Sequence, residues 1–139
     1  MACPYFHPLA RMDFSEWPAP PALPLGDPYT GECRAEAGHP RIPEAALLRR
    51  YCNLGYAAGN CPHMPETSGP DAVRFAVEAD GGASVRIHYV LERGHQPLEH
   101  GLLEFSRQSR SFLAPPEAML AAQARAYAES YLRRVPAEA

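Results

Sequence analysis

The sequence predicts a single α+β domain, in which an irregular, proline-rich half precedes an antiparallel sheet and a C-terminal helix. The chain has 139 residues, of which 46% are hydrophobic, enough to bury one modest core. Twelve of the sixteen prolines lie in residues 1–70, and after Pro70 apolar and polar residues alternate. We therefore expect one domain over residues 1–139, made of a Cys- and Pro-rich half (1–70) and a sheet-plus-helix half (71–139).

The first half is predicted to hold one helix and otherwise irregular chain. Proline fixes φ and has no N–H, so the dense proline patch at 17–28 is not expected to form a regular ladder or a long helix. Within residues 40–59, Pro43 suits a first helical turn, and apolar residues recur at helical spacing up to Cys52. A following glycine would end this helix and turn the chain back toward Cys61.

The second half is predicted to form a three-stranded meander. Residues 72–79 and 84–92 alternate between apolar and polar side chains, as strands with one buried face do. The sequence Asp80-Gly81-Gly82 between them is a strong hairpin signal, because glycine tolerates positive φ. A third strand is expected at 100–106, after a turn at 94–97.

A C-terminal helix is predicted over residues 115–134. Leu120, Ala124, Tyr127 and Tyr131 fall on one stripe of such a helix, which would cover the apolar face of the sheet. Glu129 is spaced to pair with Arg133 on the outer face of this helix.

The composition gives no sign of nucleic acid or membrane as a partner. The formal charge is −3 and the isoelectric point is about 6.0, and all thirteen basic residues are arginine. No apolar run approaches the roughly 20 residues that span a bilayer, and the first residues lack a secretory signal pattern. We therefore expect a cytoplasmic protein.

Four cysteines are the candidate functional residues, and all of them lie in the first 61 positions: Cys3, Cys33, Cys52 and Cys61. In a reducing compartment four cysteines are more often metal ligands or free thiols than disulfides. Structural zinc sites usually draw ligands from close pairs of cysteines, and no such pair is present. An iron–sulfur cluster tolerates scattered thiolates, so a [4Fe–4S] cluster is the preferred hypothesis. The alternatives are zinc, disulfides and plain buried thiols.

Neighbouring residues bear on this site. The dipeptides Cys3-Pro4 and Cys61-Pro62 resemble the last ligand position of bacterial ferredoxins, although the close C-x₂-C-x₂-C run of that family is missing. Two histidines close to the cysteines, His7 and His63, are alternative ligands. Four aromatic residues could shield a cluster from water: Tyr5, Phe6, Tyr51 and Tyr56.

A four-thiolate site would link the proline-rich arm to the helix. The free energy of metal binding would then contribute to the free energy of folding of the first half. No motif of an independent enzyme is found in the sequence. The first hypothesis is a small iron–sulfur protein that acts as an electron-transfer or accessory subunit for a partner protein. The alternatives are a zinc- or cluster-stabilised binding or assembly module, and a redox or iron sensor.

Overall fold

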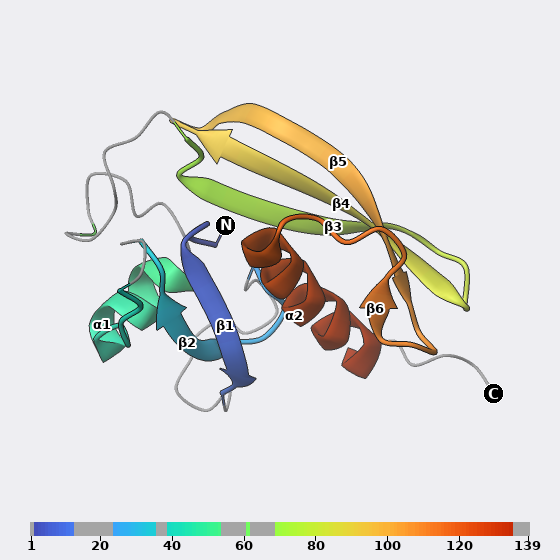
Figure 1. The fold of residues 1–139 in the computed structure, drawn as a ribbon, viewed down its shortest axis with the longest axis horizontal. Helices are drawn as coiled ribbons and strands as arrows, with labels where there is room; N and C mark the ends of the chain where they lie inside the picture. Colours follow the sequence, from blue (N-terminus) through green and yellow to red (C-terminus); the bar gives the residue numbers. More distant parts are fainter. Residues whose placement is uncertain (1, 13–23, 36–38, 54–60, 62–68, 135–139) are drawn as a thin grey trace.

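The computed structural model describes residues 2–12, 24–35, 39–53, 61 and 69–134, and it has an α+β fold with two antiparallel sheets and one C-terminal helix (Figure 1). In chain order the elements are β1 (Phe6–Arg11), β2 (Tyr29–Cys33), α1 (Ala45–Leu47), the π-helical turn η3 (Leu48–Cys52), β3 (Ala72–Asp80), β4 (Ser84–Arg93), β5 (Gln96–Ser106), β6 (Ser111–Phe112) and α2 (Ala118–Arg134).

The larger sheet confirms the predicted meander and adds a strand to it. Its order is β3-β4-β5-β6, with antiparallel neighbours throughout. The first hairpin turns where the glycines predict it, since Gly82 has a φ of +85° and its N–H donates to Asp80 Oδ1 at 2.9 Å. The second turn places Gly94 and His95 at positive φ, so β5 begins at Gln96, earlier than expected. The short β6 pairs with the end of β5 and makes the sheet four-stranded.

The prediction that the first half is irregular apart from one helix is wrong, whereas the proline patch at 17–28, for which no ladder is expected, lies largely outside the described residues. Strands β1 and β2 form a two-stranded antiparallel sheet, in which Pro8 pairs with Gly31 and the register shifts between Pro8 and Ala10. Both strands of a two-stranded sheet are edges, and edges and bulges are where a strand tolerates proline. Gly31 is required there, because a Cβ at this position would lie 2.1 Å from the backbone oxygen of His7.

The helical signal at 40–59 is realised in part. The described helical segment runs from Ala45 to Cys52, and its second turn is π-helical, with the N–H of Asn53 bonded to the carbonyl of Leu48 at 3.3 Å. Cys52 therefore lies at the end of a helical turn, as the sequence predicts. The expected continuation toward residue 59 lies outside the described residues.

Helix α2 lies between the two sheets (Figure 1). It begins at Ala118, after the prolines, and the Glu117 carboxylate accepts hydrogen bonds from the N–H groups of Met119 and Leu120 at 3.0 and 2.7 Å. Toward the small sheet, Leu120 and Ala126 join a core cluster that contains Phe6. Toward the large sheet, a second cluster gathers residues of α2, β4 and β5: Ala128, Leu132, Val85, Ile87 and Phe105.

The predicted stripe of α2 is only partly the buried one. Leu120 and Ala124 are buried, whereas Tyr127 and Tyr131 are half-buried and reach the sheet near its edge. Tyr127 stacks on Phe75 at a centroid distance of 5.5 Å. The expected pair between Glu129 and Arg133 does not form, because Glu129 pairs with Arg125 at 3.3 Å and Arg133 turns toward Asp27.

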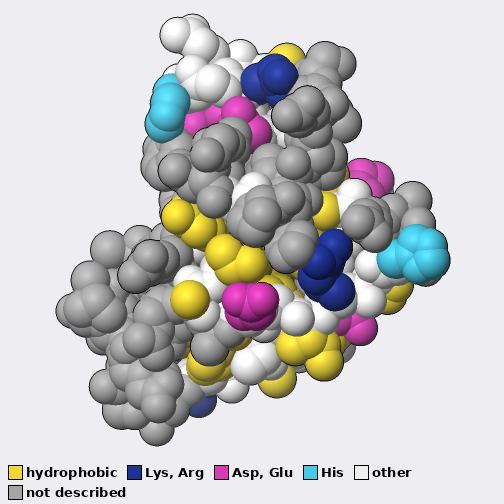
Figure 2. Space-filling view, turned by 90° about the vertical axis from the view of Figure 1, so that its left-hand side faces the viewer, with side chains coloured by type: hydrophobic (Ala, Val, Ile, Leu, Met, Phe, Trp, Pro, Cys, Tyr) yellow, Lys and Arg dark blue, Asp and Glu magenta, His cyan; other side chains and the backbone are white. Residues whose placement is uncertain are grey.

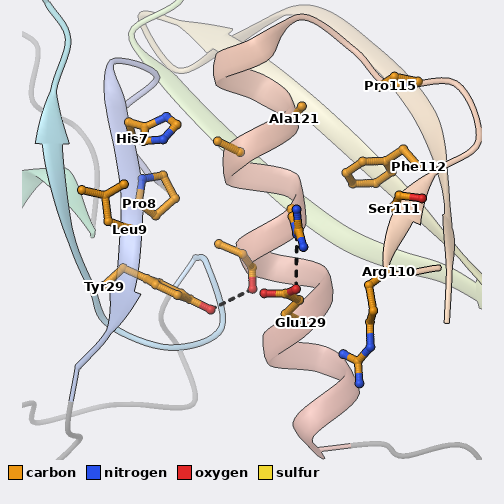
Figure 3. A pocket seen from close by; sticks show the side chains of 13 residues that line it. His7, Pro8, Leu9, Tyr29, Arg110, Ser111, Phe112, Pro115, Ala121 and Glu129 are labelled. Atoms are coloured by element: carbon orange, nitrogen blue, oxygen red, sulfur yellow. Dashed lines mark hydrogen bonds and ion pairs between the residues drawn. The ribbon is translucent and has the colours of Figure 1, made fainter. Parts of the chain in front are cut away.

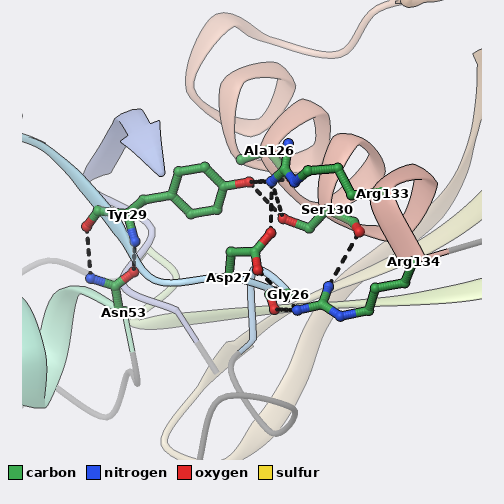
Figure 4. Close-up of polar contacts among 8 residues, drawn as sticks. All are labelled: Gly26, Asp27, Tyr29, Asn53, Ala126, Ser130, Arg133 and Arg134. Carbon is green, nitrogen blue, oxygen red and sulfur yellow. Dashed lines mark hydrogen bonds and ion pairs between the residues drawn. The ribbon is translucent and has the colours of Figure 1, made fainter. Parts of the chain in front are cut away.

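A buried polar network joins the end of α2 to the segment that enters β2 (Figure 4). Asp27 is 2% exposed and accepts hydrogen bonds from Arg133 at 2.6 Å and Arg134 at 2.9 Å. The Tyr29 hydroxyl lies 2.9 Å from the carbonyl oxygen of Ala126 and 2.6 Å from Ser130 Oγ. Burial alone would raise the pKa of Asp27, but the bonds from Arg133 and Ser130 outweigh it and hold the pKa below its ordinary value.

We expect Asp27→Asn to destabilise the fold by about 2 kcal/mol, because it removes the charge that two arginines share. Urea denaturation at pH 7 measures this free energy. A carboxylate with a lowered pKa stabilises the fold above its unfolded-state pKa, and this stabilisation is lost as the pH falls through the folded-state pKa. The difference between the variant and the parent should therefore shrink below about pH 4.

The matched control is Glu129→Gln, which breaks the more exposed Arg125–Glu129 pair and should change stability by less than about 0.5 kcal/mol. Equal effects of the two substitutions would show that Asp27 does not hold α2 to the N-terminal half.

Candidate metal centre

The turn that carries Cys3 is hydrogen-bonded through its backbone to the large sheet on one side and to the helical turn η3 on the other. Just before it, Ala2 exchanges two backbone hydrogen bonds with Val73 of β3, at 2.8 and 2.9 Å. The N–H of Cys3 then donates to the carbonyl of Cys52 at 3.3 Å. Cys3 and Cys52 are 8% and 7% exposed and belong to the same core cluster, so two of the four cysteines meet directly.

The β1–β2 pairing brings Cys33 to the same turn. Cys33 is the last residue of β2 and pairs with Phe6, three positions after Cys3. The next residue, Arg34, donates its N–H to the carbonyl of Tyr5 at 2.8 Å. Cys33 also exchanges backbone hydrogen bonds with Arg41 at 2.7 and 3.0 Å, which ties the end of β2 to the chain leading into α1.

Electrostatic effects extend to all four thiols. The pKa of Cys3 is raised to about 12, mainly by burial and with smaller contributions from the nearby Cys33 and Cys61 thiols. Burial likewise raises the pKa of Cys52 to about 12, with contributions from Cys3, Cys33 and Cys61 in that order. Cys61 is half-buried and is described alone, between segments outside the described residues. The four thiol groups are thus within range of one another's charge, and all four are free rather than in disulfides.

Backbone hydrogen bonding partly offsets the effect of burial on Cys3. Burial is the largest effect on the Cys3 pKa and raises it, whereas backbone hydrogen bonds from Tyr5 and, less, Phe6 lower it. The Phe6 N–H donates to the Cys3 carbonyl at 3.1 Å. Backbone amides that hydrogen-bond a cysteine sulfur stabilise negative charge there. Hydrogen bonds of this kind also tune iron–sulfur clusters.

Gln123 of α2 fixes the Cys3 turn from the other side, and the sequence reading did not single it out. Its side chain is 1% exposed, and Nε2 donates to the carbonyls of Cys3 and Phe6 at 2.7 and 2.8 Å. The signal that was available is a glutamine within the otherwise apolar, alanine-rich face of the C-terminal helix. Asn53 has a comparable role beside Cys52, because its side chain bonds both the N–H and the carbonyl of Tyr29.

The proposed shielding residues differ in their burial. Phe6 is 1% exposed and packs in the cluster with Cys3 and Cys52, and the half-buried Tyr5 packs against that cluster. Tyr51 is half-buried. Tyr56 lies outside the described residues.

A cavity of about 630 Å³ borders the residues that directly follow two of the cysteines. Its walls include Pro4, Tyr5 and Arg34, and opposite them Tyr89 of β4 and Met119 of α2. On the face of the molecule that carries α1, hydrophobic side chains gather across the middle (Figure 2). The cavity therefore reaches the residues that follow Cys3 and Cys33, while the cysteines themselves are not among its lining residues.

The two alternative histidine ligands receive no support. His7 lies on β1 and lines a groove of about 540 Å³ between β1, β6 and α2, with Leu9 and Phe112 on its two walls (Figure 3). Its Nδ1 is buried without a hydrogen-bond partner in the described part of the chain, and burial followed by Arg34 lowers the pKa of the ring. His63 lies outside the described residues.

Within the ranges that the structure describes, no three side chains of His, Cys, Asp or Glu are placed to hold one metal ion. No described helix is long and apolar enough to cross a membrane. Comparison with protein-family models found no match, and searches of curated proteins and of solved structures found none either.

We expect Cys3 and Cys52 of the metal-free folded protein to resist iodoacetamide at pH 8, because the reagent attacks thiolates. A pKa of about 12 leaves a thiolate fraction about a thousand-fold below that of an ordinary cysteine. Peptide mass mapping should find the half-buried Cys33 and Cys61 modified first. Because the fold raises these two pKa values, their burial stabilises it fully below about pH 9, and this contribution is lost as the pH rises toward 12.

The unfolded protein in urea is the control, since there all four cysteines should react alike. Equal rates at the four positions in the folded protein would contradict the burial of Cys3 and Cys52.

We expect Gln123→Met to lower the free energy of unfolding by about 2 kcal/mol, because the carbonyls of Cys3 and Phe6 each lose a side-chain donor and the Phe6 N–H alone remains on the Cys3 carbonyl. Urea denaturation of the full chain measures the change. The exposed Gln108 offers a control of the same chemistry, and Gln108→Met should stay within about 0.5 kcal/mol of the parent. A neutral Gln123→Met would show that the Cys3 turn holds its shape without this side chain.

Proposed function

We propose that Cys3, Cys33, Cys52 and Cys61 hold one [4Fe–4S] cluster, and that the protein is an electron-transfer or accessory subunit for a partner protein. The observation that carries the proposal is the meeting of separate chain segments at the Cys3 turn. The Cys3 N–H bonds Cys52, and the β1–β2 ladder delivers Cys33 beside Phe6. The charge effects between the thiols extend the group to Cys61.

The preference for a cluster over zinc rests on the spacing of the thiols. Cys33 and Cys61 are close enough to Cys3 and Cys52 to raise the pKa of both, yet in the described residues no three ligand side chains are gathered around the position of one ion. A cluster is wider than an ion and accepts thiolates from several directions. Backbone hydrogen bonding from Tyr5, which lowers the pKa of Cys3 against the larger effect of burial, supports the same preference, because such bonds stabilise cluster-bound sulfur.

Electron transfer is favoured because the site combines burial with access. Phe6 and the core cluster enclose Cys3 and Cys52, whereas Cys33 and Cys61 are half-buried. The cavity beside Tyr5 and Arg34 gives a partner protein a way to approach the thiols. A cluster accepts one electron from such a partner and passes one electron on, with no further chemistry required of the chain.

A structural role is the second candidate, and a surface feature favours it. Ile42, beside the bridge between Cys33 and Arg41, is 86% exposed. In this alternative a zinc ion or a redox-inert cluster stabilises a binding or assembly module, and the apolar surface near Ile42 contacts the partner. A redox or iron sensor would use the same residues, with loss of the cluster changing the bound partner.

The proposal is tested by purifying the full chain without oxygen and measuring iron, sulfide, zinc and the visible spectrum. We expect about four irons and four sulfides per chain and a broad absorption near ~400 nm that bleaches with dithionite. Each of the four Cys→Ser variants should lose most of the iron and unfold at lower urea concentration, because metal binding and folding are coupled.

The control variant is His7→Ala, which should keep the full iron content if His7 is not a ligand. One zinc per chain and no sulfide would select the structural alternative. Retention of full iron by any single Cys→Ser variant would remove that cysteine from the ligand set.

A further inference from the structure

We propose a second metal site on the outer face of the large sheet, where His88 of β4 and His100 of β5 bind a divalent transition-metal ion of the zinc type. The site is separate from the four cysteines and does not depend on the function proposed for them. Imidazole is a preferred ligand of zinc, nickel and copper ions.

The distance between the two rings fits this role. His88 Nε2 and His100 Nδ1 are 3.3 Å apart, with ring centroids at 5.4 Å and an angle of 75° between the ring planes. Two nitrogens bound to one tetrahedral ion, each at about 2.0–2.1 Å, lie roughly 3.3–3.4 Å from each other. An ion can therefore replace the contact between the rings with little movement of either side chain.

The sheet holds the two histidines in this arrangement. They lie on adjacent antiparallel strands in the most extensively paired part of the sheet, where His88 is opposite Leu102 and His100 is opposite Val90. Such diagonal neighbours on one face are within reach of long side chains. The backbone order is thus established by the hairpin before any metal binds, which lowers the entropic cost of forming the site.

The charges on this face do not oppose a cation. Two arginines near the pair are each bonded to a carboxylate: Arg86, two residues before His88 on β4, to Glu104 at 2.6 Å, and Arg74, opposite Val90 on the neighbouring β3, to Glu92 at 3.1 Å. His100 is exposed and His88 is half-buried, so an ion can reach both rings from solvent. In the described residues no third side chain of a ligand type joins them. Water then completes the coordination, and the affinity is lower than that of a site with four protein ligands.

The test is a titration of the ¹⁵N-labelled full chain with Co²⁺, a paramagnetic substitute for zinc, followed by ¹H–¹⁵N NMR. We expect the amides around residues 88 and 100 to broaden once Co²⁺ is added beyond the amount that the cysteines bind, and this local broadening to fall at least tenfold in His88→Ala and in His100→Ala. Both side chains lie on the outer face, so the variants should fold. A spectrum of the metal-free variant checks that they do.

His39→Ala is the matched control, because His39 is an exposed histidine away from this sheet, and it should leave the broadening at β4 and β5 unchanged. Broadening that stays confined to the cysteines when Co²⁺ is in excess over them would overturn the site, as would broadening at β4 and β5 that survives both histidine variants. Loss in one variant but not in the other would also overturn it, since the site requires both rings.

Discussion

The burial of helix α2 between two sheets is the constraint on which the rest of this structure depends. Neither sheet could bury its apolar face alone, because one has two strands and the other is a single curved layer. Leu120 and Ala126 close the core against Phe6, while Ala128 and Leu132 close it against Ile87. Small alanines on two sides of one helix allow both sheets to approach it closely, which explains the alanine-rich composition of this segment.

Helix α2 also fixes the backbone segments that carry the cysteines of the candidate metal centre. Gln123 bonds the backbone on both sides of the Cys3 turn, and Arg133 and Arg134 bond Asp27 at the entrance to β2. The two contacts fix the starting point of β1 and the starting point of β2. Because Cys33 is the last residue of β2, its position follows from the ladder that these contacts set. The placement of the thiols therefore depends on long-range packing rather than on a local ligand motif.

This dependence explains which features could be predicted from the sequence. The hairpins of the large sheet and helix α2 follow from local signals, namely period-two alternation, Gly81-Gly82 and the stripe that begins at Leu120. The β1–β2 sheet was missed because proline density argues against strands, whereas Pro8 is accommodated at an edge beside a register shift. The pairing of Arg133 with Asp27 could not be predicted, because 106 residues separate the partners and a nearer acid, Glu129, has the right spacing. The cysteines could be nominated from their number alone, but Gln123 gains its role only from the packing of α2.

The pKa values of the buried thiols support the proposal that a metal ion or a cluster is bound at the candidate metal centre. Without one, Cys3 and Cys52 are neutral groups whose pKa is raised to about 12, mainly by burial, yet backbone hydrogen bonding from Tyr5 acts in the opposite direction and lowers the Cys3 pKa, as it would for a charged sulfur. A backbone arranged to stabilise charge around a group that burial keeps neutral is a local conflict. A bound cation or cluster removes this conflict, because it deprotonates the thiols and compensates their charge within the core. The free energy of that binding would then be added to the stability of the small β1–β2 sheet.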